Sequence, residues 1–93
     1  MKVAVRYMAQ LRQAAGVGAE SIELDEGGSP TALLFLLAER HGAALRRLLL
    51  TEEGMPQRTL LIFVGDEQAD GARTELHDGD EVTLLSPIAG GSR

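Results

Sequence analysis

The sequence predicts a single α+β domain, in which several strands form one sheet and one main helix packs across a face of that sheet. Two observations carry this prediction. Short segments at both ends of the chain alternate apolar and polar residues, which is typical of half-buried strands. Between them, one segment carries leucines at helical spacing. With 93 residues, the chain is too short for two hydrophobic cores.

The N-terminal part of the chain is expected to form two paired strands. In KVAVRYM (residues 2–8), Val3, Val5 and Tyr7 fall on one face and the intervening residues fall on the other. SIEL (residues 21–24) is a second short strand. The glycine-bearing stretch QAAGVGAE lies between them and predicts a hairpin with a long loop.

The main helix follows the breaker cluster DEGGSPT. Ser29 can cap its N-terminus, and Pro30 suits the first helical position because its missing N–H costs no hydrogen bond there. Arg40 and His41 fall in the last turn, where positive charge is favourable, and Gly42 gives the stop. The buried stripe is expected to contain Leu33, Leu34, Leu37 and Ala38. The next segment, AALRRLLL, predicts either a second, shorter helix or an irregular remainder of the first.

The second half of the chain adds further strands. The strongest is TLLIFVG (residues 59–65), which follows the polar loop TEEGMPQR. TEL (residues 74–76) gives a brief strand, and EVTLLS (residues 81–86) gives the last one after a tight turn at Asp78–Gly79. Strands combined with one main helix predict an α+β sheet whose helix covers one face.

Alternation along these strands predicts an exposed apolar patch. The last strand turns Leu85 away from the core. In TLLIFVG we assume that Leu61 and Phe63 point into the core, so Ile62 lies on the same open face as Leu85. Met8 belongs to the outward set of the first strand, so we expect Met8, Ile62 and Leu85 to form a partner-docking patch. The alternative is that the short helix or a loop covers part of this set.

Composition narrows the classes of function. The formal charge of −5 argues against a nucleic-acid partner and favours a partner with a basic docking surface. The chain has no cysteine, which excludes disulfides, a thiolate nucleophile and a cysteine metal site. We see neither a signal-peptide core nor an apolar run long enough to span a bilayer, so no membrane partner and a cytoplasmic location are expected.

No catalytic or metal-binding constellation is apparent. His41 and His77 lack sequence-local partners at metal-ligand spacing, so each is expected to be a solvated surface side chain. The carboxylates toward the C-terminus lack the ordered spacing of a calcium loop, and the serines form no nucleophile elbow. We therefore expect neither a metal site nor catalysis by the side chains of this protein.

The C-terminal stretch SPIAGGSR offers a different chemistry. Pro87 cannot donate to a strand ladder and favours an extended residue before it, so it directs the chain out of the sheet. Gly90 and Gly91 have no Cβ, so a partner enzyme could grip the backbone in a narrow slot and work on a terminal carboxylate. An inert, frayed terminus is the alternative. The predicted division is a domain of residues 1–86 and a flexible tail of residues 87–93.

Two stretches resemble the prokaryotic ubiquitin-like sulfur carriers of the MoaD, ThiS and CysO type: VAVRYMAQLRQAAG and DGDEVTLLSPIAGG. A third, LIFVGDEQADG with TELHDGDEV, resembles the corresponding segment of ubiquitin-like β-grasp proteins. The resemblance implies a β-grasp fold with a mixed sheet of four to five strands. It implies that an ATP-dependent, E1-like enzyme adenylates Gly91, and that sulfur then replaces AMP to give a thiocarboxylate. The carrier itself would bind no cofactor. The implied tail-recognition residues are Pro87, Ile88, Ala89 and Gly90.

The resemblance leaves alternatives open. An accepting synthase would use the sulfur for molybdopterin, cysteine or another thio-metabolite. The rivals are a protein modifier joined to lysines through the same glycine, and a β-grasp module with an inert tail. Ser92 and Arg93 follow the glycine that must be terminal. A JAMM-type zinc protease removes such an extension in some family members; otherwise the pair is an artificial addition or a sign that the chain is no carrier.

Overall fold

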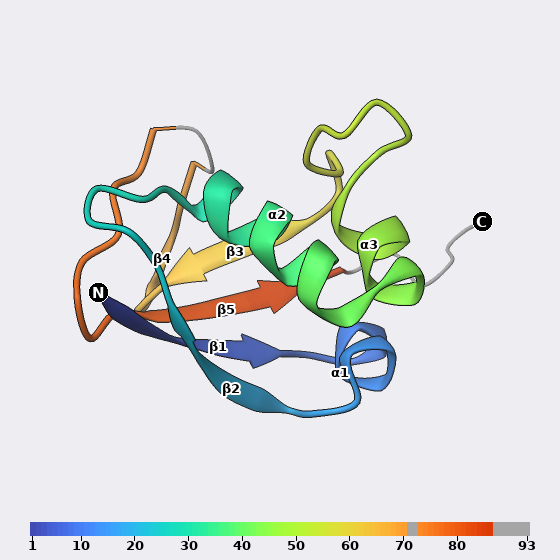
Figure 1. The fold of residues 1–93 in the computed structure, drawn as a ribbon, viewed down its shortest axis with the longest axis horizontal. Helices are drawn as coiled ribbons and strands as arrows, with labels where there is room; N and C mark the ends of the chain where they lie inside the picture. The colour runs from blue at the N-terminus through green and yellow to red at the C-terminus, as the bar shows by residue number, and fades with distance from the viewer. Residues whose placement is uncertain (71–72, 87–93) are drawn as a thin grey trace.

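The computed structural model describes residues 1–70 and 73–86 (Figure 1). In chain order its elements are β1 (Lys2–Tyr7), α1 (Gln10–Ala15), β2 (Ala19–Glu23), α2 (Pro30–His41), α3 (Ala43–Leu49), β3 (Leu61–Val64), β4 (Glu67–Gln68) and β5 (Glu81–Leu85). Among the described residues, no helix is long and apolar enough to cross a membrane.

The five strands form one mixed sheet in the order β2-β1-β5-β3-β4. The central strands β1 and β5 are parallel, and the other neighbours are antiparallel. Because β1 and β5 run in the same direction, they end at the same edge of the fold, where α1 and α3 also lie (Figure 1). The predicted mixed sheet is confirmed. Its small additional strand is β4, whereas residues 74–76 do not form a strand.

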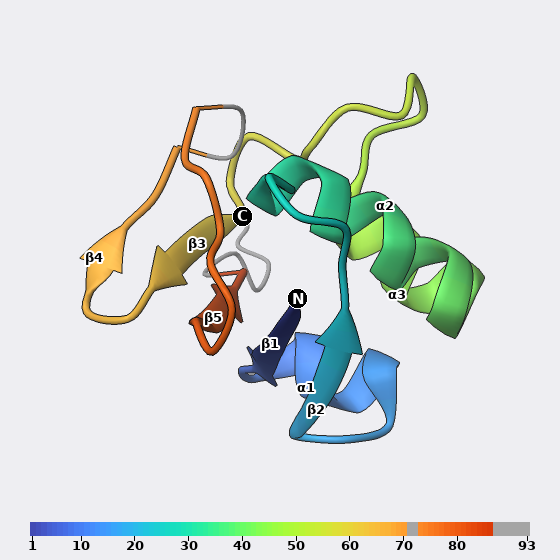
Figure 2. The same cartoon turned by 60° about the vertical axis from the view of Figure 1, so that its left-hand side comes forward.

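The main helix is confirmed, and it lies with α3 on one side of the sheet (Figure 2). The Ser29 hydroxyl accepts a hydrogen bond from the Ala32 N–H at 3.2 Å, and Pro30 is the first helical residue. Gly42 ends the helix with a φ of 92°, a conformation that favours glycine. The predicted stripe is buried: Leu33, Leu34, Leu37 and Ala38.

The inward faces of the strands meet this stripe and complete the core. Tyr7 and the two valines before it on the same face of β1 are at most 2% exposed. Val82 and Leu84 of β5 are fully buried beside them. The apolar phase predicted for these two strands is therefore correct, and the helices cover the face to which it points.

The connection between β1 and β2 contains α1, where the sequence predicts only a loop. Leu11 of this helix is fully buried, and Gly16 ends the helix with a φ of 83°. A helix of six residues is too short to be stable by propensity alone, so tertiary burial of Leu11 holds it in place. The loop prediction was wrong because this burial has no signature in the local sequence pattern.

Candidate functional site at the end of β5

The residues predicted for the C-terminal chemistry lie outside the described residues. They are Pro87, Ile88, Ala89, Gly90, Gly91, Ser92 and Arg93. The structure does describe the point at which the chain enters this segment. β5 ends at Leu85, and Ser86 follows it at the edge where β1 also ends. The surroundings of this edge therefore define the candidate site.

The sheet face opposite the core carries an apolar strip at this edge. Leu61 of β3 pairs with Leu85 of β5. Tyr7 of β1 lies beside Leu84, so Met8 and Leu85 are neighbours one residue further along the same parallel register. Met8 is 42% exposed, and the two leucines of the open face are half-buried. We call Met8, Leu85 and Leu61 the apolar strip, and it includes two of the three predicted docking residues.

Ile62, the third predicted docking residue, is not on this face. It is 6% exposed and packs in the core, whereas Leu61 and Phe63 on either side of it are half-buried. Every residue of LLIFV is apolar, so the sequence alone gives no phase for this strand. The pairing does: Ile62 lies opposite Leu84, and residues directly opposite in an antiparallel pair share a face. The outward placement of Ile62 was wrong.

Two polar residues at this edge had no role in the sequence prediction. Ser86 is buried, and its hydroxyl oxygen accepts a hydrogen bond from the Gln10 side-chain amide at 3.2 Å. Gln10 is the first residue of α1, the helix that the sequence did not reveal. The only available signal was the period-two pattern, which puts Ser86 on the inward side of the last strand.

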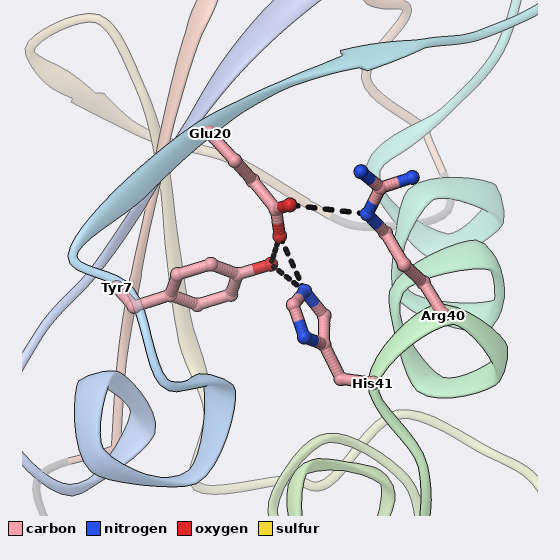
Figure 3. Close-up of polar contacts among 4 residues, drawn as sticks. All are labelled: Tyr7, Glu20, Arg40 and His41. Carbon is pink, nitrogen blue, oxygen red and sulfur yellow. Dashed lines mark hydrogen bonds and ion pairs between the residues drawn. The ribbon is translucent and has the colours of Figure 1, made fainter.

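A cluster of polar side chains joins β1, β2 and α2 (Figure 3). One carboxylate oxygen of Glu20 lies 2.5 Å from the Tyr7 hydroxyl and 2.5 Å from His41 Nε2, and the other accepts from Arg40 Nε at 3.1 Å. The side chains of Glu20 and His41 are each 14% exposed. The prediction of a solvated His41 was wrong because its partners are distant in sequence. His77 is exposed, as predicted.

The hydrogen bonds of this cluster connect β1, β2 and α2. Burial raises the pKa of Glu20, but hydrogen bonds from Tyr7 and His41 outweigh it, so the pKa of this carboxyl lies below its usual value. Burial, together with the adjacent carboxylate, raises the pKa of the Tyr7 hydroxyl, which therefore stays protonated. Within residues 1–70 and 73–86, no three His, Cys, Asp or Glu side chains are grouped to hold a metal ion.

Known proteins of similar length resemble this chain in sequence and in fold. The sequence model of the ThiS family matches residues 5–91. The molybdopterin synthase sulfur carrier subunit of Chlamydomonas reinhardtii is 29% identical over 98% of this chain and 100% of its own length.

Solved structures agree with this match. SAMP1 from Haloferax volcanii has a TM-score of 0.87 at 22% identity, covering 98% of this chain and 100% of its own, which establishes a shared ubiquitin-like β-grasp fold. The Amycolatopsis orientalis BexX/CysO complex contains a chain that is 30% identical, with a TM-score of 0.67 and coverage of 96% of this chain and 99% of its own. Because the family match spans nearly the entire sequence, the chain belongs to the ThiS family, whose members are small sulfur carriers rather than enzymes.

Proposed function

We propose that this protein carries sulfur as a thiocarboxylate on Gly91. The observation that carries the proposal is the extent of the family match, which continues to Gly91 and stops before Ser92. In the proposed reaction, an E1-like enzyme joins the Gly91 carboxylate to AMP and releases pyrophosphate from ATP. Hydrosulfide, or a donor equivalent to it, then displaces AMP and leaves –C(=O)S⁻. The adenylate is needed because a free carboxylate is a poor electrophile.

The proposal divides the chain into a folded domain, residues 1–86, and an arm, residues 87–93. The backbone from Pro87 to Gly90 would fill the slots of the activating enzyme and of the sulfur-accepting synthase. ATP would bind to the activating enzyme, and the carrier would need no cofactor of its own. Since the reaction consumes ATP, we place it in the cytoplasm.

The apolar strip supports docking of these partners. It lies at the edge from which the chain continues into the arm, so a partner that binds the strip is also close to the origin of the arm. Phe63 extends the same face, since it is half-buried and pairs with Thr83 of β5. Exposed apolar groups that cluster in this way are typical of protein–protein contacts.

Ser92 and Arg93 require removal before activation. With them present, the Gly91 carbonyl is part of a peptide amide, so Gly91 has no carboxylate that the activating enzyme could join to AMP. We propose that a JAMM-type metalloprotease adds water across the Gly91–Ser92 bond, which leaves the Gly91 carboxylate and a free Ser92 amine.

Intact-mass analysis tests this function. The chain ending at Gly91 and the chain ending at Arg93 are each incubated with the cognate activating enzyme, ATP and a sulfur donor. We expect only the shorter chain to gain the mass difference between one sulfur and one oxygen. Adducts on lysines of other proteins would support the protein-modifier alternative, and an unchanged mass of the shorter chain would refute the carrier proposal.

Two acceptors are considered: molybdopterin synthase, for which the curated relative is named, and a cysteine synthase, which the resemblance to carriers of the CysO type implies. Thiocarboxylated protein offered separately to a molybdopterin synthase large subunit and to a PLP-dependent cysteine synthase distinguishes them. Return of the carrier to its carboxylate mass marks the acceptor that consumes the sulfur.

A further inference from the structure

Ser86 occupies a position where the fold favours an apolar side chain. It follows Val82 and Leu84 on the inward side of β5, and it is only 8% exposed. Among the described residues, and leaving aside Tyr7, no other residue with a polar side chain is buried to this degree. A hydroxyl taken from water costs free energy unless it is hydrogen-bonded. Core packing alone therefore does not explain a serine here.

The partner of this hydroxyl comes from the opposite end of the sequence. Gln10 Nε2 donates to Ser86 Oγ at 3.2 Å, across a separation of 76 positions. Just before this contact, the Met8 N–H donates to the Leu84 carbonyl at 3.1 Å, which joins the end of β1 to β5. The two strands are thus held together by backbone up to Leu84 and by side chains at Ser86.

The turn that brings Gln10 to this place has a strained backbone. Ala9 has a φ of 52° and a ψ of −126°. No other non-glycine residue in the described part of the chain has a positive φ. The Leu11 N–H donates to the Met8 carbonyl at 3.1 Å, so Ala9 is the second residue of a tight turn that favours glycine. Strain of this kind persists where surrounding contacts enforce it, and it often accompanies function.

We propose that Gln10 and Ser86 are positioning residues whose hydrogen bond fixes the point and direction in which the C-terminal arm leaves the sheet. The inference rests on the proposed carrier function. Pro87 comes next in the sequence, and its ring fixes its own φ and restricts Ser86 to extended conformations. Anchoring Ser86 therefore also sets the direction of the residue after it. A defined origin reduces the ordering cost when the arm enters the slot of an enzyme.

The test compares variants of the chain that ends at Gly91. Gln10→Ala and Ser86→Ala each remove the anchor, and Gln10→Glu keeps it because the carboxylate can accept from the Ser86 hydroxyl. The matched control is Gln13→Ala, which truncates an exposed glutamine of the same helix. Two measurements are made: ATP–pyrophosphate exchange with the activating enzyme, and residual dipolar couplings of the Ile88 amide in the free protein.

We expect the two alanine variants at the anchor to raise KM about three- to ten-fold with kcat unchanged, the effect of one hydrogen bond. Their combination should be no worse than either alone, because both changes remove the same bond. The couplings of Ile88 should shrink in these variants and return in Gln10→Glu. Additive losses, an equal loss in Gln13→Ala, or an unchanged KM would overturn the proposal.

The two proposals fail in distinguishable ways. If the unmodified chain ending at Gly91 shows no exchange, the carrier function is refuted, and the Ile88 couplings alone decide on the anchor. Couplings that are identical with and without the Gln10–Ser86 bond would then overturn it. Exchange by the unmodified chain with unaltered kinetics in the anchor variants would overturn the anchor and leave the carrier function intact.

Discussion

Replacing Glu20 with alanine removes an acceptor that three side chains share. The Tyr7 hydroxyl and His41 Nε2 contact one carboxylate oxygen at 2.5 Å, and Arg40 Nε contacts the other at 3.1 Å. The Arg40 side chain is more than half exposed, so its ion pair contributes little. The Tyr7 hydroxyl and His41 Nε2 lose this acceptor in a largely buried site and keep only their long mutual contact at 3.4 Å, at a cost of about 1–3 kcal/mol each. We expect a total loss of about 3 kcal/mol, which lowers Tm by about 12–24 °C in a domain of this size.

Thermal and urea unfolding of a double-mutant cycle with Tyr7→Phe measures this coupling. Tyr7→Phe alone should cost about 1 kcal/mol, and it should cost less once Glu20 is alanine, because the hydroxyl then keeps only its 3.4 Å contact with His41 Nε2. Glu23→Ala is the control, because Glu23 is an exposed carboxylate on the same strand and its loss should stay within about 0.5 kcal/mol. Independent, additive costs of the Tyr7 and Glu20 changes would refute the shared-acceptor reasoning.

The same cluster predicts the direction of a pH dependence. The folded-state pKa of Glu20 is lowered, so the unfolded chain binds more protons in the acid range. The contribution of Glu20 is complete above its unfolded pKa and is lost as the pH falls through the folded pKa. Glu20→Gln should therefore lose less stability on acidification than the natural chain. Tyr7 has a raised pKa, so its contribution is complete below about pH 10 and declines as the pH rises further.

Three further predictions use other features of the structure. Ala9→Gly should raise the free energy of unfolding by about 1 kcal/mol because it relieves a positive φ, whereas Ala14→Gly inside α1 should lower it by about 1 kcal/mol; thermal melting compares the two. Gln57→Ala should cost about 1–2 kcal/mol in urea unfolding, since the Gln57 amide donates to two carbonyl groups at the end of α3. Leu85→Asp should weaken binding to the activating enzyme in calorimetry, while Met55→Asp, at a 62% exposed loop position, should not.

The elements that the sequence predicts best are those whose signal is local. A serine cap, a proline at the first position and a glycine stop identify α2, and alternation identifies the inward face of β1. The elements that it predicts poorly depend on distant partners. The helix α1 forms because the core buries Leu11. Ile62 points into the core because it lies opposite Leu84. His41 looks like a surface residue until Glu20 of another strand is beside it.

The register between β3 and β5 links the core to the docking face. A slip of one residue would move Ile62 to the open face and bring Leu61 and Phe63 inside, because successive side chains of a strand point to opposite faces. Both arrangements bury leucine, isoleucine or phenylalanine, so hydrophobicity discriminates between them weakly. The register must therefore be selected by the other residue pairs of β3 and β5, which are consistent with Leu61 lying opposite Leu85. A change that loosens this pairing should then damage partner binding before it unfolds the domain, since it replaces Leu61 of the apolar strip with Ile62 while an apolar core remains.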